Sequence, residues 1–299
     1  MQTRNLNSNP RLLVTLCLAA LLSAVSSFAP AAAPPPVAVP ELNPVLVKSP
    51  VQWMQEFLGR LDLTPEQIQQ ILEVFRSHAA ELQVVAVEEF AARTLLNQAV
   101  HQCTPNPIAV RMATVGVAAA DLQLNLLRAA LFAEIHPILT EGQRAELQGL
   151  TDLVQGWVTQ AAGSCGSNSG PHPVLDALRD LAAAKLGLTE DQRAQLQAVI
   201  DRHKPLVCTQ LNQEIAARKS LLAAIRKPAV DTGAILAAST TVYEVDVAFN
   251  LERADIYAEV CAILTPEQKD KLRGIVDRVR TAVEKLLEAL AGVFPQAAW

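Results

Sequence analysis

Histidines and cysteines are the residues of this chain best able to bind a metal ion or to react covalently. The sequence contains no H-x-x-x-H or C-x-x-C spacing and no methionine-rich tail. The five histidines are His78, His101, His136, His172 and His203. We expect His78 and His203 to be surface or packing residues of helices. No glycine-rich phosphate loop, nucleophile elbow or paired-carboxylate motif is present either. The sequence therefore predicts no enzyme, no cofactor and no metal site.

Four arginines recur at a fixed spacing together with acidic residues. The pairs, each 125 residues apart, are Arg93/Arg218, Arg128/Arg253, Asp121/Asp246 and Glu134/Glu259. The simpler interpretation is that they form ion pairs that fix the register of packed helices. The alternative is that the arginines line a concave face beside apolar residues and contact unfolded or acidic protein segments.

The segments that must position these residues are predicted to be helical. From Thr64 onward, apolar residues follow the i, i+3, i+4 pattern of one helix face, which predicts a helix to about Val100. A turn at residues 103–107 places Asn106 as the next N-cap, and a second long helix runs to about His136. No strand alternation competes with this pattern. Pro205 predicts a kink in the later long helix near Asp201.

A five-residue signature, L-T-x-x-Q, begins four of the predicted helices. Threonine at N-cap can accept from the N3 amide, and glutamine at N3 can reach back to the N-cap amide. The first two copies lie 76 residues apart, as do the last two, and the pairs are offset by 125 residues, which indicates a duplicated module. The capping residues are Leu63, Thr64 and Gln67; Leu139, Thr140 and Gln143; Leu188, Thr189 and Gln192; Leu264, Thr265 and Gln268.

With this spacing the signature resembles the LTxxQ family of bacterial periplasmic proteins, represented by the Spy and CpxP stress chaperones. The resemblance covers about residues 51 to 290 as two tandem copies. It implies an all-α fold with two repeats of an antiparallel helical hairpin or bundle. Spy-like proteins are homodimers that form a cradle and hold unfolding proteins without ATP. We therefore expect an intramolecular pseudo-dimer, with a homo-oligomer as the alternative.

The chain divides into six predicted segments. Arg4 and Arg11 precede and open an apolar run, which predicts a secretory signal peptide over residues 1–31 and a periplasmic location. A retained membrane anchor is the less favoured alternative, because a spanning helix needs roughly 20 apolar residues. A Pro/Ala-rich linker (32–50), a first helical module (51–162), a Gly/Ser linker (163–172), a second module (173–291) and a tail (292–299) follow.

Four cysteines remain after removal of the signal peptide, an even number that is typical of disulfides in an oxidising compartment. We expect a bond between Cys103 and Cys165 to be feasible, because both lie toward the far turn of the first module. Cys208 and Cys261 would lie roughly 25 Å apart in straight helices, too far for a bond. Pairing between modules or between molecules stays open.

The charge and the apolar content of the chain limit the classes of molecule that it is expected to bind. The chain carries 25 basic and 30 acidic residues, a net charge of −5, which argues against nucleic-acid binding. Thin antiparallel helices cannot bury every apolar side chain, so unfolded or aggregation-prone proteins are the expected partners. The candidate contact residues are Trp53, Met54, Phe57, Phe90, Arg93, Arg128, Arg218 and Arg253. The alternatives are a stress or metal-sensing regulator that binds a membrane sensor domain, and a purely structural envelope module.

Overall fold

The computed structural model describes residues 61–149, 152, 156 and 185–274 and shows an all-α protein, as predicted. Within these residues there is no strand. The helices are α3 (Pro65–Ser77), α4 (Ala79–Val100), α5 (Pro107–Ile135), the 3-10 helix η3 (His136–Ile138), α8 (Glu190–Ile225) and α9 (Thr232–Ile263). Residues 141–149 and 266–274 are also helical. We call residues 61–149 the first half and residues 185–274 the second half. The predicted signal peptide and linkers lie outside the described residues.

The helices begin where side chains satisfy their free amides. Thr64 and Thr189 form complete capping boxes with Gln67 and Gln192 at the starts of α3 and α8. Asn106 caps α5 by accepting from the amides of Ile108 and Ala109, and Pro107 follows at the first helical position. These local interactions set where each long helix starts.

Breaks in the long helices differ from the prediction. The helix expected to run from Thr64 to Val100 is interrupted at His78, which separates α3 from α4. α8 continues through Pro205 as one helix of 36 residues, and the kink expected near Asp201 stays a prediction. Proline removes only one hydrogen bond from the ladder, and the packing of α8 along α9 retains the helix on both sides of it.

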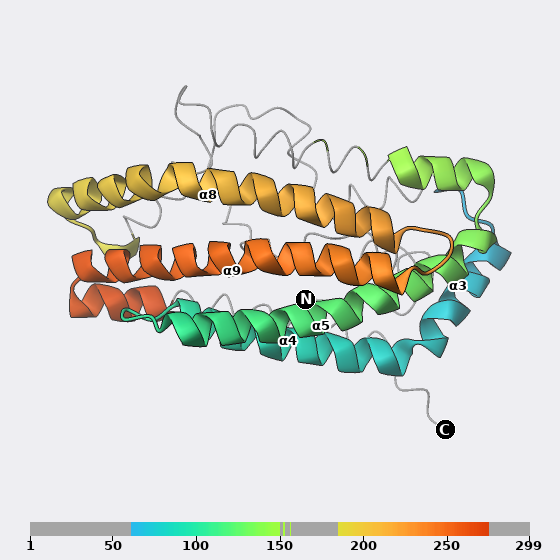
Figure 1. The fold of residues 1–299 in the computed structure, drawn as a ribbon, viewed down its shortest axis with the longest axis horizontal. Helices are drawn as coiled ribbons and strands as arrows, with labels where there is room; N and C mark the ends of the chain where they lie inside the picture. Colours follow the sequence, from blue (N-terminus) through green and yellow to red (C-terminus); the bar gives the residue numbers. More distant parts are fainter. Residues whose placement is uncertain (1–60, 150–151, 153–155, 157–184, 275–299) are drawn as a thin grey trace, which may run out of the picture.

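Two antiparallel hairpins, α4/α5 and α8/α9, pack side by side so that α5 and α9 form the seam between the halves (Figure 1). The start of α5 lies against the end of α9, because Cys103 is bonded to Cys261 and Asn250 donates to Thr114. The two hairpins are therefore antiparallel to one another. The turn between α4 and α5 therefore lies beside the end of α9.

The core is divided into separate clusters along this elongated bundle. One cluster joins α3, α5 and the first two signatures through residues such as Ile71, Leu131 and Leu139. Two more fill the seam, one around Ile235 and another around Val100 and Val110. Because no single core spans the bundle, each helix has a long outward face.

The disulfide between Cys103 and Cys261 corrects the expected bond between Cys103 and Cys165. Their Cα atoms are 5.4 Å apart, and the bond joins the two halves. The expected bond lay within the first module, and pairing between modules was left open. The antiparallel packing places Cys261 beside the far turn of the first half and so selects pairing between the halves. Cys208 is also disulfide-bonded.

Candidate functional site

The signature glutamines do more than cap their own helices. Gln67 Nε2 donates to Gln143 Oε1 at 2.8 Å, and Gln143 Nε2 donates back to Gln67 Oε1 at 3.0 Å. The same amides also donate to the carbonyls of Ile138 and Leu61. Gln192 and Gln268 form an equivalent pair in the second half, at 2.7 and 3.0 Å. The signature therefore ties two helix starts together in each half, and its spacing of 76 residues is the sequence signal of that pairing.

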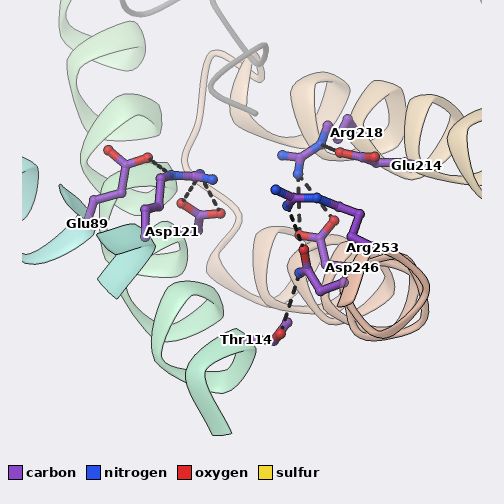
Figure 2. A network of polar contacts seen from close by, with 9 residues as sticks. Glu89, Thr114, Asp121, Glu214, Arg218, Asp246 and Arg253 are labelled. Atoms are coloured by element: carbon purple, nitrogen blue, oxygen red, sulfur yellow. Dashed lines mark hydrogen bonds and ion pairs between the residues drawn. The ribbon is translucent and has the colours of Figure 1, made fainter. Parts of the chain in front are cut away.

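A network of charged residues crosses the middle of the bundle (Figure 2). In the first half, Arg93 donates to Glu89 at 2.7 Å and to both oxygens of Asp121. In the second half, Arg218 binds Glu214 at 2.8 Å and Asp246 at 3.3 Å. Each residue of one set lies 125 positions from its counterpart in the other. The two halves thus present matching ion pairs to the seam.

Burial shifts the pKa values of the aspartates in this network. The pKa of Asp246 is raised to about 6, mainly by burial; Arg218 opposes this rise, and Glu214 and Asp121 add to it. Burial also raises the pKa of Asp121 despite the neighbouring charge of Arg93. The pKa of Asp121 responds to Arg218 as well, so the two sets interact across the seam.

Arg128 and Arg253 complete the network through asparagines. Arg128 lies 3.5 Å from Asn125 Oδ1, and Arg253 donates to Asn250 Oδ1 at 3.0 Å. Arg93 and Arg218 therefore join neighbouring helices, whereas Arg128 and Arg253 contact asparagines of their own helices. Their contact with a client stays a prediction. The partners Glu89 and Glu214 were not predicted, although their spacing of 125 residues was available in the sequence.

His78 and His203 link helices in equivalent ways. His78 Nε2 lies 2.9 Å from Glu134 on α5, and His203 Nε2 lies 3.2 Å from Glu259 on α9. Burial lowers the pKa of His78, but hydrogen bonds and charges from Glu134 and Glu81 outweigh it and raise the pKa. The hydrogen bond that His203 donates to Glu252 is the main cause that raises the pKa of His203. In both cases the carboxylates stabilise the protonated histidine relative to a free imidazole.

Large apolar side chains are exposed on both α4 and α5. These side chains are between 43% and 72% exposed. On each helix the residues recur at spacings that place them on one face. We call this set the α4/α5 apolar face; its members are Val84, Val87, Leu95, Ile108, Met112 and Val115.

The second half lacks this face. At the equivalent positions, 125 residues later, it carries small or polar residues, all of them exposed. They are Thr209, Asn212, Ser220, Gly233, Ala237 and Thr240. The exposed large apolar residues of the described second half lie at other positions, namely Ile200, Leu206, Val230 and Leu236. The two halves therefore expose different side chains at positions 125 residues apart.

Of the four apolar residues predicted to contact a client, the structure describes one. Phe90 on α4 is half-buried, and Trp53, Met54 and Phe57 lie outside the described residues. The prediction missed the six residues of the α4/α5 apolar face. Comparison of the two modules position by position would have revealed them, because the difference in polarity is present in the sequence.

The described residues offer no group of three or more His, Cys, Asp or Glu side chains that could hold a metal ion. The nearest arrangement is His203 between Glu252 and Glu259. The two carboxylates bind opposite nitrogens of the ring, so the three side chains do not converge on one point.

The stretch Pro107–Ile138 is long and apolar enough to cross a membrane by length and composition. In this fold it packs along α4 and α9, and the core helix of a water-soluble bundle can meet the same criterion.

Part of the chain matches a known protein family. Residues 154–271 match the family model described as heavy-metal resistance. No curated protein and no solved structure matches the chain. The matched stretch contains α8, α9 and the last two signatures. Over these residues the chain is therefore similar to the heavy-metal resistance proteins, a helical family related to the LTxxQ proteins of the Spy and CpxP type.

Proposed function

We propose that this chain is an exported, ATP-independent chaperone-like protein of the periplasm that binds unfolded or stressed envelope proteins. The observation that carries the proposal is the α4/α5 apolar face, with exposed large side chains on two adjacent helices. Contiguous exposed apolar patches mark surfaces that bind other molecules. A polypeptide that has lost its fold exposes apolar side chains, which gain free energy when they leave water against such a face.

The second half acts as a scaffold in this proposal. It has the helical layout of the first half and packs against it through α5 and α9, as a second subunit would in a dimer. Its outward positions equivalent to the apolar face are small or polar, and so they add solubility rather than affinity. One chain would thus supply both members of a pseudo-dimer, with binding concentrated on one member. No nucleic acid, cofactor or catalysed reaction forms part of this function.

Light scattering by an aggregating client tests the proposal. The mature chain should suppress aggregation without ATP. The variant Val84→Thr, Val87→Asn, Leu95→Ser, Met112→Ala and Val115→Thr installs the residues that the second half carries at the same positions. It should lose most of the suppression while keeping its helical content. The control Ile200→Thr, Leu206→Thr and Leu236→Thr removes apolar residues of comparable exposure from the second half and should suppress as the wild type does.

A second candidate function is a periplasmic stress or heavy-metal sensing regulator that binds the domain of a membrane sensor. The match of residues 154–271 to the heavy-metal resistance model favours it. The same assay separates the two functions when it is run with and without zinc or copper. Suppression without metal supports the chaperone, and metal binding without suppression supports the regulator.

A further inference from the structure

A second surface feature, separate from the α4/α5 apolar face, lies at the base of the first half. It is an open groove of about 520 Å³ between α3, the end of α5 and η3. Its lining combines two carboxylates with apolar side chains: Gln70, Glu73, Val74, Ser77, Glu134, Pro137 and Ile138. The volume falls within the roughly 300–1,000 Å³ typical of pockets that bind small ligands.

Both carboxylates of this groove have a cationic neighbour. Glu134 binds the ring of His78 through Oε1 at 2.9 Å. Glu73 lies 3.4 Å from Arg76, and both of these side chains are mostly exposed. One oxygen of Glu134 is therefore engaged with a histidine, and Glu73 has a single, solvent-exposed partner. The groove lining thus combines two carboxylates, each with one cationic partner, with apolar side chains.

The second half shows what a guanidinium does at the equivalent place. Glu259, the counterpart of Glu134, binds His203 through Oε1 and Arg202 through Oε2, the latter at 2.6 Å. Arg202 is the counterpart of Ser77. In the first half this position holds only a short hydroxyl side chain, which donates to the carbonyl of Val74. The carboxylate is thus kept in both halves, whereas its arginine is present in one.

We propose that the groove of the first half binds an arginine side chain of a partner polypeptide. The guanidinium would take the place at Glu134 that Arg202 takes at Glu259, and Glu73 would add a second negative charge. Apolar residues beside that arginine would contact Val74, Pro137 and Ile138 on the floor of the groove. The planar guanidinium suits a carboxylate better than an ammonium group does, so arginine is preferred to lysine.

An exposed ion pair alone binds weakly. The probe is therefore a short peptide, acetyl-Ala-Leu-Arg-Leu-Ala-amide, which places apolar side chains on both sides of the arginine. Its citrulline version has the same shape without the charge. Titration of the intact mature protein, followed by NMR, should show saturable shifts near the groove, with binding about threefold weaker for citrulline, the ratio expected for loss of an exposed ion pair.

Variants taken from the protein's own second half sharpen the test. Ser77→Arg should let the chain fill its own groove and weaken peptide binding at least about tenfold, and Glu134→Gln should weaken it in the same direction. Arg202→Ser should open the equivalent place beside Glu259 and raise the number of peptides bound. The α4/α5 variant described above should bind the peptide normally, so this result is separable from the proposed function.

The proposal is overturned if the peptide does not bind at millimolar concentration, if the citrulline peptide binds equally well, or if the folded Ser77→Arg variant binds as the wild type does.

Discussion

The sulfur of Cys103, in the turn before α5, is bonded to the sulfur of Cys261, near the end of α9. The two residues are 158 positions apart, and the bond is the covalent link between the halves among the described residues. It fixes the antiparallel packing of the hairpins at one end of the seam. Further along the seam, a hydrogen bond of 3.4 Å joins Asn250 to Thr114. The packing of the halves is therefore specified by long-range contacts.

Removal of this disulfide should lower stability. A bond that closes so long a loop restricts the unfolded chain, and the expected loss for Cys103→Ser with Cys261→Ser is about 2–5 kcal/mol. Urea unfolding followed by circular dichroism measures the change. The wild type under reducing conditions is a weaker comparison, because Cys208 is also in a disulfide. Equal midpoints for the variant and the oxidised wild type would refute the role assigned to this bond.

The paired signature glutamines should be energetically coupled. Gln67→Ala leaves the amide of Gln143 with fewer partners, so each single substitution should cost about 1–3 kcal/mol. The double variant should cost less than the sum of the two, by at least about 0.5 kcal/mol, because both remove the same contact. Gln192 and Gln268 offer a matched cycle in the second half. Strict additivity in both cycles would show that each glutamine only caps its own helix.

Stability should depend on the titration of Asp246. Its pKa is raised by burial from 3.8 to about 6, so the folded state holds this proton more tightly than the unfolded state does. The fold therefore loses stability through this group as the pH rises from about 4 to about 6, by up to about 3 kcal/mol. Asp246→Asn should flatten the pH dependence in that window. A variant with the same slope as the wild type would contradict the assignment.

The histidine ion pairs should make stability depend on pH above about pH 6. Because the pKa of His203 is raised from 6.5, its contribution is present below that pH and is lost as the pH rises through the folded pKa. His203→Gln should remove this loss, which thermal melting between pH 6 and pH 9 can measure. His78→Gln is the matched variant in the first half. Melting curves with an unchanged pH dependence in both variants would count against the ion pairs.

Much of the fold followed from local sequence patterns. Thr64 with Gln67, and Asn106 with Pro107, predict the starts of α3 and α5 because capping depends on residues three or fewer positions apart. The all-α class followed from the same patterns. Local patterns do not show how hairpins pack on one another, and so the bond between Cys103 and Cys261 was missed. The break at His78, which has no proline or glycine beside it, was also not predicted.

The candidate surfaces were predictable in part. The recurring arginines were identified, but their positions in the seam depend on the packing of α5 against α9. The apolar face and the groove both become visible when the modules are compared residue by residue. Val87 corresponds to Asn212 and Ser77 to Arg202, differences that single-helix periodicity does not reveal.

Site-specific photocrosslinking tests the central claim most directly. A photoreactive residue is placed at Val87 or Val115 on the apolar face, or at the matched positions Asn212 or Thr240 of the second half, and a chemically unfolded client is added. We predict strong crosslinks from positions 87 and 115 and weak ones from positions 212 and 240. Equal crosslinking from both halves, or none from the first half, would contradict the assignment of client binding to the α4/α5 apolar face.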